Sequence, residues 1–277
     1  MLKQRVVTAV VLLAILALAL TVAAPWGFPL FAGVFVVAGV WEWLRLTGVA
    51  QAPALALAAA LGVALLALSH FSVAPATGPG QGILVLAAVL WGAMALRLVL
   101  MRRFFPLAGH RAVHALTGLV LVAACWIALD AAYARGIGFM VSIMALVWTA
   151  DSAAYFAGRA FGRHKLAPAI SPNKTWEGVA GGVLGVWVVA LVCALLPALA
   201  GTFFARVWAA LSIPGALAVF TFLTGMSIVG DLFESHLKRE AGVKDSSRLL
   251  PGHGGVLDRI DALLPALPLA VLIGGWL

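Results

Sequence analysis

Charged residues are scarce in this sequence: Asp, Glu, Lys and Arg make up 10% of the 277 residues, against 64% hydrophobic residues. A soluble domain carries about 25% charged residues, which cover its surface. The shortage excludes an ordinary soluble globular domain and predicts that lipid solvates most of the chain. Because a helix satisfies its own backbone hydrogen bonds in lipid, we expect an all-α, polytopic helical bundle in a membrane.

Cysteine is also rare, with two residues, Cys125 and Cys193, each inside an apolar run. Two isolated thiols exclude a disulfide framework and a cysteine-based metal site. Both are expected to be packing residues.

Acidic residues are few, ten against 18 basic ones, and the net charge is +8. A nucleic-acid-binding protein would gather its cations in one patch or stripe. Here the cations are spread over short segments between apolar runs, which is typical of the positive-inside bias of membrane proteins. We therefore expect a lipid bilayer and no nucleic acid as partner.

About nine apolar runs are long enough to cross the roughly 30 Å hydrocarbon core of a bilayer, which takes about 20 residues per helix. They cover residues 6–24, 28–44, 54–71, 82–100, 113–132, 136–156, 178–200, 207–229 and 256–277. The first run also resembles a signal peptide, with Lys3 and Arg5 ahead of it. Its apolar stretch exceeds the 7–15 residues of a signal peptide, so we expect a retained helix.

With the N-terminus in the cytoplasm, nine spans put every Lys and Arg on the cytoplasmic side except Arg135 and Arg206. This asymmetry supports the span count and the orientation. Two long hydrophilic loops, residues 158–177 and 230–255, then face the cytoplasm. We expect residues 1–147 to be a transmembrane scaffold and residues 148–277 to be the catalytic region.

Residues 230–261 hold six of the ten acidic residues. Asp258 and Asp261 are three apart, so on a helix their carboxylates share a face. Clustered carboxylates at a membrane boundary need compensation, and a hard cation such as Mg²⁺ provides it. The pattern suits metal-assisted phosphoryl or nucleotidyl transfer, with nearby cations as phosphate partners. On charge alone, a solvated cytoplasmic loop explains the segment equally well.

The arrangement of these residues resembles the phosphatidate cytidylyltransferase family. Its signature is matched by Ser235, Lys238, Arg239, Lys244, Asp245, Pro251, His253, Gly254, Gly255, Asp258, Arg259 and Asp261. Arg248 stands where the family often has Asn. A second shared stretch runs from Asp151 to Gly178 and includes Ser171, Asn173, Lys174 and Thr175. The resemblance covers residues 148–264.

The resemblance implies transfer of CMP from CTP to phosphatidic acid, giving CDP-diacylglycerol and pyrophosphate in phospholipid biosynthesis. It also implies a homodimer and a cytoplasm-facing site in a bacterial inner membrane. Asp231, Asp258 and Asp261 would hold one or two divalent ions, Mg²⁺ first. Lys238, Arg239 and Lys244 would bind phosphates, and His253 would handle a proton. The residues implied to bind substrate are Ser171, Asn173, Lys174, Thr175, Ser235, Arg248, Gly254, Gly255 and Arg259.

Three local patterns have simpler interpretations beside the functional ones. Ser171 followed by Pro172 is typical of a helix start, which would bind phosphate or be a plain turn. Gly178, Gly181, Gly182 and Gly185 resemble a dinucleotide-binding pattern, but in an apolar run they favour close helix–helix contact. Glu42, between two tryptophans, is interpreted as an anchor at the membrane interface.

Two other functions are compatible with an apolar, polytopic chain. An ion-coupled transporter would carry charges near the bilayer midplane on broken helices, often in inverted repeats. Here the charges gather at one face and no repeat is visible. A CTP-dependent membrane lipid-alcohol kinase is the second alternative, and the 235–261 pattern argues against it.

Overall fold

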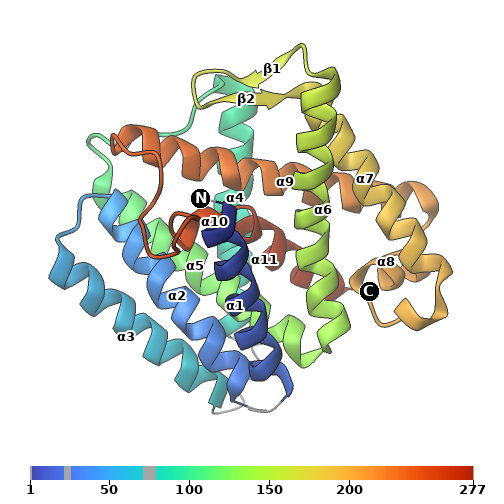
Figure 1. The fold of residues 1–277 in the computed structure, drawn as a ribbon, viewed down its shortest axis with the longest axis horizontal. Helices are drawn as coiled ribbons and strands as arrows, with labels where there is room; N and C mark the ends of the chain where they lie inside the picture. The colour runs from blue at the N-terminus through green and yellow to red at the C-terminus, as the bar shows by residue number, and fades with distance from the viewer. Residues whose placement is uncertain (1, 22–25, 71–78, 277) are drawn as a thin grey trace.

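The computed structural model describes residues 2–21, 26–70 and 79–276, which form a helical bundle with a short β-hairpin at one end (Figure 1). The helices are α1 (Leu2–Thr21), α2 (Gly27–Leu46), α3 (Gln51–His70), α4 (Pro79–Met101), α5 (Arg111–Ala134), α6 (Ile137–Phe161), α7 (Trp176–Leu195), the 3₁₀ turn η1 (Pro197–Leu199), α8 (Phe203–Ala210), α9 (Ile213–Glu240), α10 (Leu257–Ile260) and α11 (Leu263–Gly274). The antiparallel hairpin consists of β1 (Lys165–Ala167) and β2 (Ser171–Thr175). The all-α prediction is confirmed.

Among the described residues, seven helices are long and apolar enough to cross a membrane: α2, α3, α4, α5, α6, α7 and α9. The predicted count of about nine is not confirmed. The first predicted run is helical in α1, and its residues 22–24 lie outside the described part, as do residues 71 and 277 at the ends of two other runs.

The two predicted spans nearest the C-terminus are broken. Residues 207–229 divide between α8 and α9, because Pro214 begins a new helix after the turn at Leu211 and Ser212. Residues 256–277 divide between α10 and the 12-residue α11. Pro265 has no N–H to donate to the carbonyl of Asp261, four residues earlier, so a continuous helix is interrupted there.

The predicted loops are shorter than expected because the helices beside them are longer. α6 continues to Phe161 and α9 continues to Glu240. Of the predicted segment 158–177, most is hairpin. Of the segment 230–255, the part after residue 240 lies outside a helix and runs to α10.

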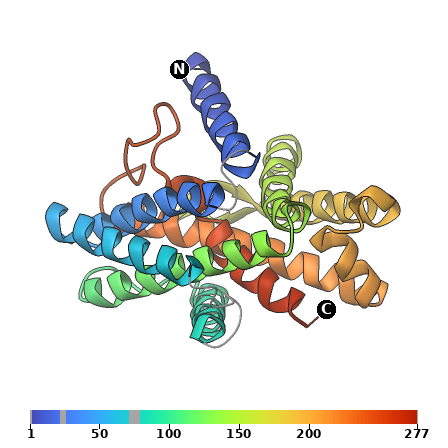
Figure 2. The same ribbon diagram turned by 90° about the horizontal axis from the view of Figure 1, so that it is seen from below.

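Aromatic packing fixes α9 against the N-terminal half of the chain. Phe233 of α9 is 1% exposed, and its ring centroid lies 5.8 Å from those of Trp43 in α2 and Trp91 in α4, and 5.1 Å from that of Phe104. α9 crosses the middle of the bundle, while α1 projects away from the other helices in Figure 2. The position of α9 matters because it carries Asp231 and Lys238.

Helices α6 and α7 pack closely through the glycines of α7. A Cβ added at Gly181 would lie 2.2 Å from Ala157 Cβ, and one at Gly185 would lie 2.6 Å from Ala153 Cβ. The prediction of a close helix–helix contact is confirmed. The hairpin lies at the end of this pair, where α6 leads into it and α7 follows it (Figure 1).

Candidate active site

The hairpin carries four predicted site residues on β2: Ser171, Asn173, Lys174 and Thr175. Its register pairs Lys165 with Thr175 and Ala167 with Ser171. The prediction that Ser171 caps a helix is wrong, because its backbone pairs with β1. Thr175 is the N-cap of α7, and its hydroxyl accepts a hydrogen bond of 3.1 Å from the Gly178 N–H.

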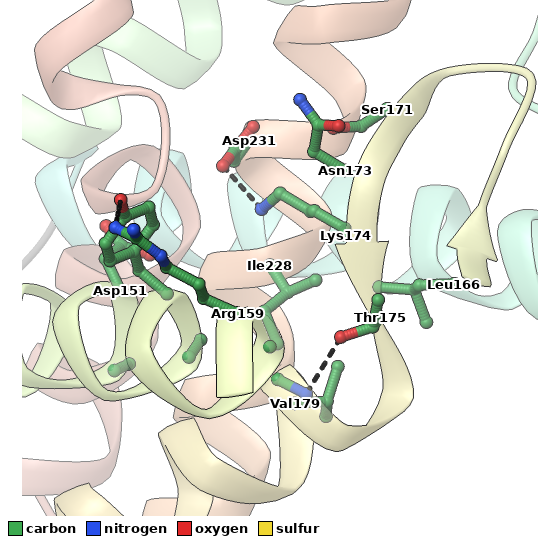
Figure 3. A pocket seen from close by; sticks show the side chains of 15 residues that line it. Asp151, Arg159, Leu166, Ser171, Asn173, Lys174, Thr175, Val179, Ile228 and Asp231 are labelled. Atoms are coloured by element: carbon green, nitrogen blue, oxygen red, sulfur yellow. Dashed lines mark hydrogen bonds and ion pairs between the residues drawn. The ribbon is translucent and has the colours of Figure 1, made fainter. Parts of the chain in front are cut away.

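A cavity of about 570 Å³ opens between the hairpin, α6, α7 and α9 (Figure 3). Lys174 of β2 and Asp231 of α9 form an ion pair across it, with Nζ 2.5 Å from Oδ2. Ser235, one turn after Asp231, donates a hydrogen bond of 3.3 Å to the other carboxylate oxygen. The cavity therefore joins the two stretches of sequence that were expected to act together.

The α6 wall of this cavity supplies three polar residues that the sequence did not assign to the site: Asp151, Tyr155 and Arg159. Arg159 Nη1 lies 3.3 Å from the Tyr155 hydroxyl oxygen and donates to it. Asp151 is close enough to Lys174 and Asp231 for their charges to interact. The three residues are spaced four apart, about one helical turn, which puts them on one face of α6. This spacing could have indicated from the sequence that they act together.

Asp261 lies against α9 beside Asp231. A Cβ added at Gly230 would lie 2.4 Å from the Asp261 carbonyl oxygen, so the absence of a side chain at Gly230 permits this close approach. Burial and the neighbouring charge of Asp231 raise the pKa of Asp261 to about 8. Two carboxylates that repel each other form the acidic part of the site.

Asp258, in contrast, is held by donors. Its Oδ1 lies 2.5 Å from Lys238 Nζ, and its Oδ2 accepts bonds from the backbone N–H of Gly255 (2.8 Å) and from both the N–H and the hydroxyl of Ser246 (3.0 Å each). Burial raises the pKa of Asp258, but these bonds outweigh it and the net shift is downward. Asp258 thus organises the segment before α10.

Lys238 is itself shared, because its Nζ also lies 2.5 Å from Oε2 of Glu234, a residue only 1% exposed. The Glu234 carboxylate oxygens have no partner of hydrogen-bond geometry among the described residues. Lys238 therefore compensates two buried carboxylates at once. These two ion pairs explain the presence of Lys238 in the family signature better than direct binding of a phosphate does.

Glu42 is the residue that the sequence most clearly misassigned. It is fully buried, not an anchor at the membrane interface. Its carboxylate accepts four hydrogen bonds: from the hydroxyls of Ser246 (3.0 Å) and Ser247 (2.5 Å), and from the N–H groups of Val256 (2.9 Å) and Leu257 (2.6 Å). Glu42 ties α2 to α10, a contact that spans more than 200 residues of sequence.

The glycines of the 251–255 loop are required by this packing. Gly254 has a φ of +84°, a conformation that favours glycine. A Cβ at Gly255 would lie 2.0 Å from Ser246 Oγ. These two glycines therefore approach protein groups closely. Arg259 donates two bonds to the His253 carbonyl, of 3.0 and 2.6 Å, while His253 Nδ1 is buried with no partner among the described residues.

Three predicted phosphate-binding cations, Arg239, Lys244 and Arg248, are exposed. Within the described ranges, none of them forms an ion pair. They lie on the end of α9 and the following loop, and none of them lines the cavity.

The predicted metal ligands do not form a ready cluster. In the part of the chain that the structure describes, no group of three or more His, Cys, Asp or Glu side chains is arranged to hold a metal ion. Asp231 and Asp258 are each paired with a lysine. Asp261 forms no ion pair among the described residues, although the charges of Asp231 and Lys174 both act on it.

Comparison with known proteins matches nearly the whole chain. The model of the cytidylyltransferase family matches residues 3–275. The chain is 40% identical to a phosphatidate cytidylyltransferase of Pseudomonas aeruginosa, with 100% of this chain and 99% of the relative covered. It is 36% identical to the enzyme of that name from Haemophilus influenzae, with 97% and 96% covered. A Staphylococcus haemolyticus relative of the same name is 43% identical over 48% of each chain.

Proposed function

Because the chain belongs to the cytidylyltransferase family, we propose a site and a mechanism for its reaction, the transfer of CMP from CTP to phosphatidic acid with release of pyrophosphate. The protein is a multi-pass membrane enzyme that makes CDP-diacylglycerol. The observation that carries the assignment of the site is the Lys174–Asp231 ion pair in the cavity between the hairpin and α9. The matched stretch 151–178 lines that cavity, together with Asp231, which precedes the 235–261 pattern by four residues.

CTP binds in this cavity, whose volume of about 570 Å³ is within the usual range of small-ligand sites. Lys174 and Arg159 provide positive charge for the triphosphate, and Ser171 and Asn173 provide neutral hydrogen-bonding groups. A phosphate in the cavity competes with Asp231 for Lys174. When substrate binds, the Lys174 ammonium group therefore donates to a phosphate oxygen instead of to Asp231.

The chemistry needs little from a general base. A phosphate oxygen of phosphatidic acid, already ionised near neutral pH, attacks the α-phosphorus of CTP, and the bond to the pyrophosphate oxygen breaks. Lys174 and Arg159 stabilise the charge that develops on the transferred and leaving phosphates. Ile228 and Val179 form an apolar part of the cavity wall beside these charged groups.

The carboxylates Asp231 and Asp261 fit a divalent cation. They are adjacent, they offer hard oxygen atoms, and their repulsion would be relieved by a positive ion. When bound, Mg²⁺ would neutralise part of the triphosphate charge. Asp258 is better described as a positioning residue, because each of its oxygens already accepts hydrogen bonds from the protein.

Glu42, Asp258 and Lys238 hold α10 in place beside α9. α10 has only four residues, so its own hydrogen bonds fix it weakly. The four bonds to Glu42 and the bonds to Asp258 supply the missing rigidity. They keep Asp261, which follows α10 directly, beside Asp231 on α9.

The site faces the cytoplasm of a bacterial inner membrane, as the positive-inside bias of the charged segments supports. This orientation gives CTP access from water and phosphatidic acid access from the bilayer. Homodimerisation, which the resemblance implies, is a further part of the proposal, as is the absence of a nucleic-acid partner. Cross-linking in native membranes followed by mass determination tests the dimer.

Two labels on CTP test the function. Purified protein is incubated with Mg²⁺, CTP labelled either in the cytosine ring or on the γ-phosphate, and either phosphatidic acid or a lipid alcohol. Cytidylyl transfer puts the ring label on the lipid and the γ-label in pyrophosphate. A lipid-alcohol kinase would put the γ-label on the lipid and the ring label in CDP, and a transporter would incorporate neither. Chelation of divalent cations with EDTA should stop the reaction. Turnover that continues in EDTA would contradict the requirement for a divalent cation.

A further inference from the structure

A second cavity, of about 470 Å³, lies on the other side of the hairpin, next to α4. Its wall is mostly apolar, with Leu98 and Val99 from α4, Trp176 at the start of α7 and Leu232 from α9. Val99 is 70% exposed and Trp176 is 51% exposed. In a membrane protein, large exposed apolar side chains face lipid tails, so this cavity opens toward the bilayer.

Two cations, Arg102 and Lys165, lie at this apolar cavity. Neither forms an ion pair within the described residues. Arg102 directly follows the end of α4 and has a φ of +57°, a backbone conformation that is costly for a residue with a side chain. Two unpaired cations beside an apolar cavity match a molecule with a strongly anionic head and an apolar tail.

The second cavity adjoins the first. Leu166 of β1 lines both, and the consecutive residues Asp231 and Leu232 of α9 line one cavity each. Lys165 pairs in the hairpin with Thr175, the neighbour of Lys174. The two cavities therefore adjoin at Leu166 and at residues 231–232 of α9. Figure 1 shows the hairpin lying beside one end of α4.

We propose that the second cavity binds the phosphatidic acid substrate, with an acyl chain along Leu98, Val99 and Trp176 and the phosphate held by Arg102 and Lys165. This inference rests on the proposed function and assigns the lipid its own site. A phosphate monoester carries about −1.5 to −2 charges near neutral pH, whereas the diester of other anionic phospholipids carries one. Two cations therefore favour phosphatidic acid over the bulk anionic lipids of the membrane.

Steady-state kinetics in mixed micelles test the site. The double variant Arg102→Gln, Lys165→Gln should raise the KM for phosphatidic acid about tenfold or more, and change the KM for CTP less than about twofold. Arg103→Gln is the matched control, since Arg103 is the exposed neighbour of Arg102 and lines neither cavity. A double variant with the KM of the control for phosphatidic acid would overturn the inference.

A binding measurement on the wild-type protein keeps the test independent of variant folding. Phosphatidic acid with a photoreactive diazirine in its acyl chain should label peptides containing residues 98–102 or 165–170, and unlabelled phosphatidic acid should compete better than phosphatidylglycerol. Labelling of other peptides would overturn the proposed site. Equal competition by phosphatidic acid and phosphatidylglycerol would show a general anionic-lipid surface, which also overturns the proposal. If the wild type makes CDP-diacylglycerol while these tests fail, the lipid site alone is wrong. If no CDP-diacylglycerol forms, the proposed function itself fails.

Discussion

Asp258 and Asp261 are three residues apart and both belong to the family signature, but their surroundings predict different roles. Asp258 accepts bonds from Lys238, Ser246 and Gly255, so its charge is compensated by the protein. Asp261 is beside another carboxylate, and its side chain accepts one bond, from the adjacent Ala262 N–H (2.7 Å). Stability and activity measured together on the same variants separate the two roles.

Asp261→Asn should lower the rate on the order of a thousandfold while leaving the melting temperature equal or higher. The amide keeps the bond from Ala262 and resembles the protonated carboxyl that the raised pKa favours, but it cannot ionise to bind a cation. Asp258→Asn should also be inactive, and it should destabilise the fold by about 1–3 kcal/mol, because buried donors lose their acceptor. Rates and melting curves in detergent check both. An Asp261→Asn variant that keeps more than about a tenth of the wild-type rate has no ligand role at this position.

Glu42→Gln should impair both stability and catalysis although Glu42 lies outside the cavity. An amide cannot accept all four bonds, because its NH₂ faces donors, so at least one donor is left unpaired at a cost of about 1–3 kcal/mol. Glu240→Gln is the control. Glu240 accepts one bond, of 2.8 Å from the Leu107 N–H, which an amide oxygen can keep. Equal melting temperatures and rates for the two variants would contradict the positioning role.

The packing of α6 on α7 sets the position of the hairpin, and it depends on glycine. Gly181→Ala should lower the melting temperature, with a cost of about 1–3 kcal/mol, because the new methyl group would lie 2.2 Å from Ala157 Cβ. Gly225→Ala in α9 is the control, since nothing lies within 4 Å of the added Cβ. That change should be neutral or stabilising by up to about 1 kcal/mol. A Gly181→Ala protein as stable as the control would show that the contact is loose.

At the level of elements, apolar run length predicted the middle helices well, because the need to span a bilayer dominates there. α2, α3, α4, α5 and α6 each contain most of a predicted run. The breaks before α9 and α11 were missed although Pro214 and Pro265 mark them, since run length ignores the donor that proline lacks. The hairpin was missed because strands of three and five residues carry almost no periodic signal.

The site was predictable where its residues are close in sequence. Asp231, Ser235, Lys238 and Asp258 lie in one block, and the structure brings them to one end of α9. Glu42 could not be predicted in this way, because its partners lie more than 200 residues along the chain and no local pattern reveals such contacts. The resemblance implies a phosphate role for Lys238, and sequence alone cannot show that Glu234 and Asp258 also form ion pairs with it.

Across the whole molecule, the charge asymmetry predicts which ends face the cytoplasm. In a background without Cys125 and Cys193, cysteine at Lys244 should react with an impermeant thiol reagent only after cells are opened. Cysteine at Gly201 should react in intact cells, because it lies in the turn on the opposite side of the predicted topology. Both positions are exposed. Strong labelling of the Lys244 position in intact cells would show that the orientation is opposite to the predicted one.

The central claim is that CTP binds in the cavity closed by Lys174 and Asp231, and the kinetics of Lys174→Gln test it most directly. Loss of one positioned donor to a developing phosphate charge costs about 10²–10³ in rate. The account predicts a fall of about a hundredfold or more in kcat/KM for CTP, an unchanged KM for phosphatidic acid, and wild-type kinetics for the exposed control Arg163→Gln. If Lys174→Gln uses CTP as efficiently as Arg163→Gln, CTP does not bind there and the account is wrong.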